Sequence, residues 1–236
     1  MKLIKTSVIA MAVMLVSVFT FAQTAEEIVA KHVEAIGGAA AWKKINSIYY
    51  EGKLTVQGAE INVTMTSLNG KGVRQNLTVM GMTGYQIITP TAGWNFMPFQ
   101  GQTTAEAMTA DELKASSDDL DVQGKLVDFK SKGHTVEYLG KDDVEGTECF
   151  KLKITSKAGN VETIFIDPKT YYVVRTIQKR VANGQESDVP TDLSNYKKLP
   201  EGIIVPFSIT LPFGELVISK ADVNKPVDES LFKPAN

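Results

Sequence analysis

The chain has 236 residues, of which 43% are hydrophobic and 22% charged, and its 27 acidic and 25 basic residues give a formal net charge of −2. This balance gives no electrostatic reason to expect nucleic acid or an anionic lipid surface as a partner. The single cysteine, Cys149, excludes an internal disulfide, so the fold must be stabilised by its hydrophobic core.

The first 22 residues have the features of a secretory signal peptide. Lys2 and Lys5 precede an uncharged apolar run from Thr6 to Phe21, and small residues before Gln23 suit cleavage there. Elsewhere the chain has no comparable run of eighteen apolar residues. We therefore expect a signal peptide at 1–22, export to the periplasm, and one soluble domain at 23–236 that behaves as a monomer.

A helix is predicted directly after the cleavage site. Thr24 and Glu27 have the spacing of a capping box, an apolar stripe follows at helical spacing, and Gly37-Gly38 marks the end. The next segment, "AAAWKKI", is expected to add a helical turn that brings Trp42 onto the core.

From residue 47 the hydrophobic period changes from 3.6 to 2. Segments 47–56, 60–67, 148–155 and 203–211 each place apolar side chains on one face and polar ones on the other. Turn dipeptides such as Gln57-Gly58 and Asn69-Gly70 separate these runs. The pattern predicts about eleven strands in antiparallel succession.

The β pattern is interrupted between about 101 and 133. Thr109 and Glu112 form a second capping box, and Leu113, Leu120 and Val122 follow without a clean period. We expect one or two short helices here, inserted midway through the sheet.

These elements predict a mainly β (α+β) domain. A single antiparallel sheet would curl into an open half-barrel, with the first helix and the inserted helices covering its concave apolar face. The stretch "GWNFMPF" (93–99) carries large apolar side chains on both faces, so we expect one face to border a ligand space, with Trp94 and Phe96 pointing into it.

Several segments resemble the LolA-like carriers, the family of outer-membrane lipoprotein-sorting proteins. They are "GWNFMP" (93–98), "FIDPKTYYVVRT" (165–176), Tyr196 followed by "PEGIIVPFSI" (200–209), and "DESLFKP" (228–234). The opening "EAIGGAAAWKKINSI" (34–48) is similar to a variant group from Gram-negative bacteria. The resemblance spans the whole chain after the signal peptide through loose patterns.

The resemblance implies a periplasmic half-barrel of about eleven strands with a helical lid. Its cavity would shield acyl chains of lipoproteins or of lipids, and membrane proteins on either side would load and receive the cargo. In that family a buried arginine on an early strand holds the lid. Arg74, the only arginine before Arg175, is the candidate latch.

The predicted site is an apolar ligand cavity under a lid. Methionine suits such a lining because it is flexible and polarizable, although methionine and aromatic side chains in strands also fill ordinary cores. The predicted cavity residues are Tyr50, Val63, Met65, Leu77, Trp94, Phe96, Phe150, Leu152, Phe165 and Phe207, and the predicted lid residues are Met108, Leu113, Leu120 and Val122.

No catalytic or metal-binding motif stands in the sequence. His32 and His134 are isolated from any nucleophile or zinc pattern, so no catalytic residue, metal or cofactor is expected. Three functions remain open: a carrier or chaperone for acyl chains, a non-enzymatic envelope sensor or protein-interaction module on the same fold, and, least supported, a secreted hydrolase.

Overall fold

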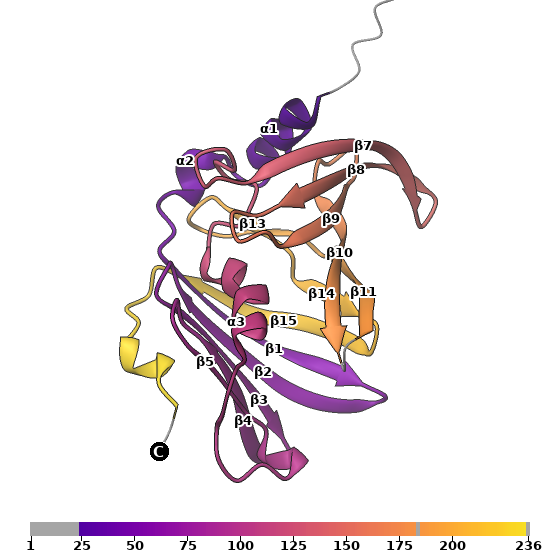
Figure 1. Ribbon diagram of the computed structural model, residues 1–236. Coiled ribbons are helices and arrows are strands. Elements are labelled where there is room, and N and C mark those ends of the chain that lie inside the picture. The colour runs from indigo at the N-terminus through magenta and orange to yellow at the C-terminus, as the bar shows by residue number, and fades with distance from the viewer. Residues whose placement is uncertain (1–23, 183–184, 235–236) are drawn as a thin grey trace, which may run out of the picture.

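Most of the chain forms one curved antiparallel sheet (Figure 1). The computed structural model describes residues 24–182 and 185–234, so the predicted signal peptide 1–22 lies outside the described residues. Within them, thirteen strands form a sheet whose end strands do not pair with each other. The predicted open half-barrel is therefore confirmed.

The strands follow the alternation seen in the sequence. There are more of them in the described residues than the eleven predicted, because several are very short. Their bounds are β1 (Ser47–Val56), β2 (Ala59–Leu68), β3 (Gly72–Val79), β4 (Met82–Ile88), β5 (Gly93–Phe96), β6 (Glu106–Ala107), β7 (Thr135–Val144), β8 (Thr147–Thr155), β9 (Val161–Ile166), β10 (Val173–Ala182), β11 (Gln185–Ser194), β14 (Ser208–Leu211) and β15 (Gly214–Val223), with a separate pair β12 (Lys197–Lys198) and β13 (Ile204–Val205).

The chain path explains where the insert lies. The sheet order is β6-β5-β4-β3-β2-β1-β15-β14-β11-β10-β9-β8-β7. The chain thus runs outward from β1 to one edge at β6, restarts at the opposite edge at β7, and returns to pair β15 with β1. Residues 108–134, here called the strap, must therefore cross the open side of the sheet.

The strap contains the two short helices expected there, α3 (Ala110–Ala115) and the 3₁₀ turn η2 (Ser117–Leu120). The predicted capping box is present, since Thr109 accepts from the Glu112 amide and the Glu112 carboxylate accepts from the Thr109 amide at 2.8 Å. The rest of the strap is a series of turns. Its conformation after η2 comes from contacts with the sheet, because no hydrophobic period fixes it.

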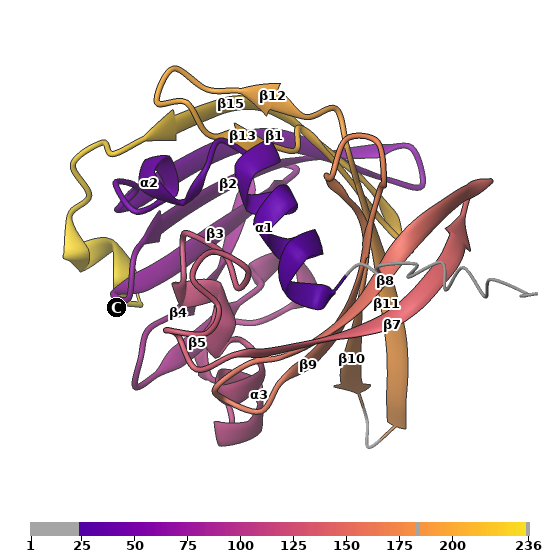
Figure 2. The same cartoon turned by 90° about the horizontal axis from the view of Figure 1, so that it is seen from above.

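Two N-terminal helices, α1 (Ala25–Ala35) and α2 (Ala39–Trp42), cover the concave face. Seen from above, α1 lies within the curve formed by β1–β5 on one side and β7–β11 on the other (Figure 2). Ile28 and Val29 of α1 pack on Phe150, Leu152 and neighbouring side chains. Trp42 of α2 packs with Ile45, Ile48 and Val205.

The turn between these helices requires glycine. Gly37 has a φ of +111°, and a Cβ there would lie 2.4 Å from the Gly202 carbonyl oxygen. The same turn brings the Ile36 carbonyl within 3.0 Å of the Trp42 indole nitrogen and 2.9 Å of the Ile204 amide, which both donate to it. The helical cover is thereby fixed to β13.

A C-terminal 3₁₀ turn, η3 (Glu229–Phe232), packs on the outer face of the sheet. Phe232 lies against β3 where Gly72 leaves room, since a Cβ at Gly72 would meet the ring at 2.3 Å. Tyr85, Ile87 and Phe232 form a small core there. This half of the sheet is therefore covered on its convex side as well.

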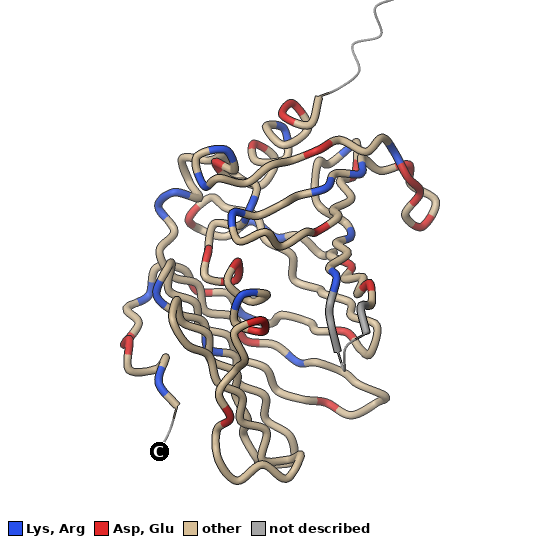
Figure 3. Tube along the Cα trace, in the orientation of Figure 1, with Lys and Arg blue, Asp and Glu red and all other residues tan. Residues whose placement is uncertain are grey.

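Charged side chains are unevenly distributed (Figure 3). They are frequent around α1, α2 and β7–β8, whereas residues 75–105, which run from β3 to just before β6, contain no Lys, Arg, Asp or Glu. The strap accordingly has its ionic partners on the N-terminal helices, in Glu26–Lys130 and Lys43–Asp128, and on β9, in Lys125–Glu162. Within the described ranges, no helix has the length and apolar character needed to cross a membrane.

Candidate functional site

The concave face borders an open apolar pocket, here called the main cavity, of about 300 Å³. A cavity of this size far exceeds the ~10–15 Å³ that one water needs by the same measure, and it lies at the lower end of the ~300–1,000 Å³ typical of small-molecule sites. Its lining comes from α1, α2, the strap and both halves of the sheet: His32, Ile36, Trp42, Tyr50, Asp121, Val122, Gln123, Gly124, Lys125, Leu126, Val127, Ile154, Glu162, Ile164, Val173, Thr176, Leu193, Tyr196, Ile204, Val205 and Pro206.

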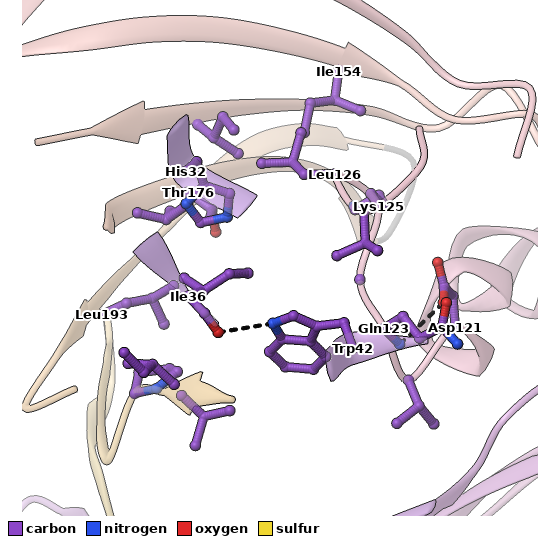
Figure 4. Close-up of a pocket in the computed structure, with 18 of the residues that line it drawn as sticks. His32, Ile36, Trp42, Asp121, Gln123, Lys125, Leu126, Ile154, Thr176 and Leu193 are labelled. Atoms are coloured by element: carbon purple, nitrogen blue, oxygen red, sulfur yellow. Dashed lines mark hydrogen bonds between the residues drawn. The ribbon is translucent and has the colours of Figure 1, made fainter. Parts of the chain in front are cut away.

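The walls are predominantly hydrocarbon. Figure 4 shows Ile36, Trp42 and Leu126 arranged around a common open space, with Leu193 on the sheet side. The indole nitrogen of Trp42 donates to the Ile36 carbonyl, so the ring presents its apolar part to the cavity. Such a surface favours apolar ligands.

One corner of the main cavity is ionic. Lys125 of the strap forms a close ion pair with Glu162 of β9, whose other carboxylate oxygen accepts from the Gln178 amide at 3.0 Å. The Glu162 side chain is only 9% exposed and that of Lys125 20%. Both residues also line an adjoining polar hollow of about 260 Å³, with Asp118 and Asn160. The ion pair therefore separates the apolar space from a polar one.

A second apolar space, here called the side cavity, has a volume of about 160 Å³. Tyr50 and Pro206 belong to the lining of both cavities, so the two meet there. The side cavity lies between the sheet and the loop before β14, and its lining is Tyr50, Glu51, Gly52, Val63, Met65, Gln75, Pro206, Ile209, Leu216 and Ile218.

Four of the predicted site residues line these two spaces. Tyr50 lines both cavities, Val63 and Met65 line the side cavity, and Val122 of the strap lines the main cavity. Val63 and Met65 lie two residues apart on β2, and Met65 pairs with Tyr50 on β1. The alternation of these adjacent strands is what brings the three together.

Trp94 and Phe96 lie on the opposite face of the sheet. The register pairs Met65 with Gln75, Gln75 with Gln86, and Gln86 with Asn95, so Asn95 shares the cavity face. Its neighbours Trp94 and Phe96 must then point to the convex side. They pack there with Tyr85, Ile87 and Phe232, which corrects the expectation that they border the ligand space.

The remaining predicted cavity residues contribute to packing. Phe150 and Leu152 lie under α1, and Phe165 packs with Cys149 and Val144 on the convex face. Phe207 belongs to the core around Trp42, with the Lys197 ammonium over its ring. Leu77 is half-buried on β3 opposite Gly84 and lines neither cavity.

The predicted lid residues are spread along the strap. Met108 lies over Gly93 of β5, where a Cβ would meet its sulfur at 2.4 Å. The Leu120 carbonyl accepts from the Gly70 amide at 2.8 Å, and the Val122 amide donates to the Asn69 side chain at 3.2 Å. The strap is thus tied to the β2–β3 turn. Leu113 is half-buried on α3 and lines neither cavity.

Arg74 contacts the C-terminal segment. Its Nη1 donates to the Leu231 carbonyl at 3.0 Å, its Nε donates to Asn76 at 2.8 Å, and its guanidinium lies 4.5 Å from the centre of the Tyr85 ring. These contacts lie on the convex face and hold η3. They correct the candidate latch assignment, since they do not reach the strap.

Sequence reasoning missed most of the main cavity. His32, Ile36 and Trp42 come from the N-terminal helical segment, which the sequence pattern predicted only to cover the concave face of the sheet. Lys125 and Glu162 were missed because charged residues normally lie in water. Glu162 does break the alternation of its strand, since Ile164 and Ile166 share its inward face. A single carboxylate among the apolar residues of one strand face was therefore the signal in the sequence that could have pointed to this ionic corner.

His32 is a titratable group in the wall of the main cavity that has a structural partner. His32 is buried, and its Nδ1 donates to the Tyr171 carbonyl at 2.8 Å. Burial lowers the pKa of His32, and this hydrogen bond opposes the shift in part. In the described part of the chain, no group of three His, Cys, Asp or Glu side chains is arranged to hold a metal.

Comparison with solved structures identifies the fold. A LolA superfamily protein from Nitrosomonas europaea aligns with a TM-score of 0.57 and 11% identity, covering 89% of this chain and 97% of that one. A DUF1329 family protein from Desulfovibrio piger aligns at 0.55 and 12%, covering 89% and 98%. A domain assigned as an outer membrane lipoprotein-sorting protein from Vibrio parahaemolyticus aligns at 0.52 and 14%, covering 88% and 95%.

These similarities extend over nearly the whole of each chain, and the protein has a LolA-like fold. At 11–14% identity they define the fold alone. No family model matches the sequence, and no curated protein matches it.

Proposed function

We propose that the protein is a periplasmic carrier that holds acyl chains of a lipoprotein or lipid in the main cavity for transfer to the outer membrane. The observation that supports this proposal is the apolar pocket of about 300 Å³ between the sheet, α1, α2 and the strap. The similarity to a structure assigned to outer membrane lipoprotein sorting is compatible with it.

The energetics favour hydrocarbon in this space. Each CH₂ group moved from water to an apolar environment gains about 0.8 kcal/mol, so an acyl chain of sixteen carbons represents on the order of 10 kcal/mol. The cavity walls of Ile36, Trp42, Leu126, Ile164 and Leu193 supply such an environment. Without a ligand, the side chains that line the cavity would lack packing partners on the side that faces it.

The strap provides a route for entry that leaves the sheet intact. It spans the two unpaired sheet edges and is held by polar contacts of Asn69, Gly70 and Lys125 and by the buried side chains of Leu126 and Val127. Breaking these contacts would open the cavity without disturbing the strand ladders. The proposed role is binding without chemistry, which a lining made mainly of hydrocarbon suits.

The test is to purify the native protein gently, extract it with organic solvent and analyse the extract by mass spectrometry. We expect stoichiometric acyl lipid in the extract. The delipidated protein should also take up a fluorescent acyl lipid with a saturable isotherm. An empty extract together with no uptake would contradict the carrier function. Recovery of one stoichiometric protein partner under those conditions would instead favour an interaction module.

A further inference from the structure

The junction of the two cavities contains an unsatisfied hydroxyl group. Tyr50 lies on β1 between Met65 and Ala221 of the neighbouring strands and lines both spaces. Within the described part of the chain, none of the hydrogen bonds involves its hydroxyl, in contrast to Tyr196, whose hydroxyl donates to the Val173 carbonyl at 2.6 Å. Tyr50 is thus a polar group with spare hydrogen-bonding capacity on an apolar wall.

The Tyr50 hydroxyl is open to the cavity. Among the described residues, no fully buried side-chain nitrogen or oxygen lacks a partner. An unpaired hydroxyl must therefore be reachable from the space that it borders. Loss of hydration raises the pKa of Tyr50 to about 12, so the phenol stays protonated near neutral pH and can donate. Gln75, which also lines the side cavity, likewise has no side-chain partner in these ranges.

A plain hydrocarbon chain would not suit this junction. Burying the hydroxyl under CH₂ groups would be unfavourable, because it would lose water and gain no acceptor. A carbonyl oxygen at the same place would accept its hydrogen. A free carboxylate is disfavoured, since Lys125, the cation in the lining of the main cavity, is already paired with Glu162.

We propose that the ligand is an acyl ester or amide whose carbonyl accepts a hydrogen bond from Tyr50, with hydrocarbon extending into the main cavity on one side and the side cavity on the other. This inference rests on the proposed carrier function. It adds that recognition depends on a neutral carbonyl flanked by apolar groups. The carbonyl could belong to a glycerophospholipid or to the acylated N-terminus of a lipoprotein.

The test compares a diacyl phosphatidylglycerol with its dialkyl ether analogue, which has the same chains and headgroup but lacks the carbonyls. The affinity of each lipid is measured by its displacement of a neutral naphthylamine fluorophore. The measurement is made on three delipidated proteins: wild type, Tyr50→Phe and Tyr49→Phe. Tyr49 is a matched control because it lies next to Tyr50 on the other face of β1, where its hydroxyl donates to Glu51 at 3.3 Å. A diacylglyceryl lipopeptide forms a third arm.

We expect wild type to bind the ester more tightly than the ether by about 3- to 10-fold, as one neutral hydrogen bond predicts. Tyr50→Phe should lose this preference and bind the ether unchanged, and Tyr49→Phe should behave as wild type. Tighter binding of the lipopeptide than of the phospholipid, with the same Tyr50 dependence, would identify a lipoprotein as the source of the carbonyl. The reverse order would identify a phospholipid.

Two results would overturn the inference in distinguishable ways. If wild type binds ester and ether equally, or if Tyr50→Phe weakens both alike, the carbonyl contact is wrong while the carrier function stands. If none of the lipids displaces the fluorophore from the wild type, the carrier function and the inference both fail.

Discussion

His32 is a buried ionisable side chain in the wall of the main cavity. Burial lowers its pKa from an ordinary value of 6.5, so the folded state favours the neutral ring. The unfolded chain takes up a proton on His32 at higher pH than the folded chain does. The stability that depends on neutral His32 is therefore complete above pH 6.5 and is lost as the pH falls through the lowered folded pKa.

Substitution of His32 by Gln should remove this pH dependence. We expect the difference in unfolding free energy between wild type and His32→Gln to be flat above about pH 7 and to fall below pH 6.5, by at most about 1.4 kcal/mol per pH unit for one proton. Urea unfolding across pH 5–8 measures it. His134 is present in both proteins, so its contribution to the pH dependence cancels in the difference. A difference that stays constant down to pH 5 would contradict the assignment.

The position of the strap depends on contacts of its side chains with the sheet. Lys125 approaches Glu162 at the edge of the main cavity, and Asn160 of the same sheet half donates to Asp118 at 3.1 Å. The strap has few regular hydrogen bonds of its own. Its attachment to the sheet is therefore expected to respond to single polar substitutions.

Lys125→Met should destabilise the protein, because Glu162 would remain buried with only its Gln178 contact. We expect a loss of about 2–3 kcal/mol, somewhat below the ~3–5 kcal/mol of a fully buried pair. Chemical denaturation provides the measurement. Adding Glu162→Gln should recover much of the loss, since the buried Glu162 charge would be gone and Asp118, 3.9 Å from Lys125 in the wild type, would keep its hydrogen bond from Asn160.

An exposed ion pair provides the matched control for that experiment. Lys53 and Glu60 lie 2.7 Å apart with side chains 58% and 62% exposed. Lys53→Met should therefore cost no more than about 1 kcal/mol. Equal losses for Lys53→Met and Lys125→Met would show that the strap contact has no special importance.

At the scale of the whole molecule, curvature creates the space. The sheet curls without closing, the N-terminal helices cover part of its concave face, and the strap joins the two edges. A solid core would need larger side chains at the positions that line the cavity. The protein instead keeps Leu193, Val173 and Thr176 there. Ligand capacity should therefore depend on side-chain volume at these positions.

Leu193→Trp should fill part of the main cavity and reduce uptake of a fluorescent acyl lipid at least about tenfold. Because the indole would enter existing space, the unfolding free energy should change by less than about 1.5 kcal/mol. Titration and urea unfolding of the same variant give the two quantities. Val217→Trp, at a 45% exposed position, is the control and should bind normally. Full uptake by Leu193→Trp would exclude the main cavity as the binding site.

The elements and their layering follow from local signals in the sequence. Alternation in strands such as 47–56 and 148–155 requires one buried face per strand, and the capping boxes at Thr24 and Thr109 fix two helix starts. These signals are local, since they depend on residues within one turn or one strand. They were enough to predict a curled antiparallel sheet with a helical cover and an inserted segment.

Which apolar faces border a space depends on long-range packing, which local patterns do not reveal. Trp94 and Phe96 satisfy the same local rule as Val63 and Met65, but strand register puts the first pair under Phe232 and the second at the side cavity. Arg74 and Lys125 likewise obtain their partners, Leu231 and Glu162, from distant parts of the chain. The physical reason is that a strand pattern fixes which side chains share a face, whereas the chain segments that cover each face are fixed by long-range packing.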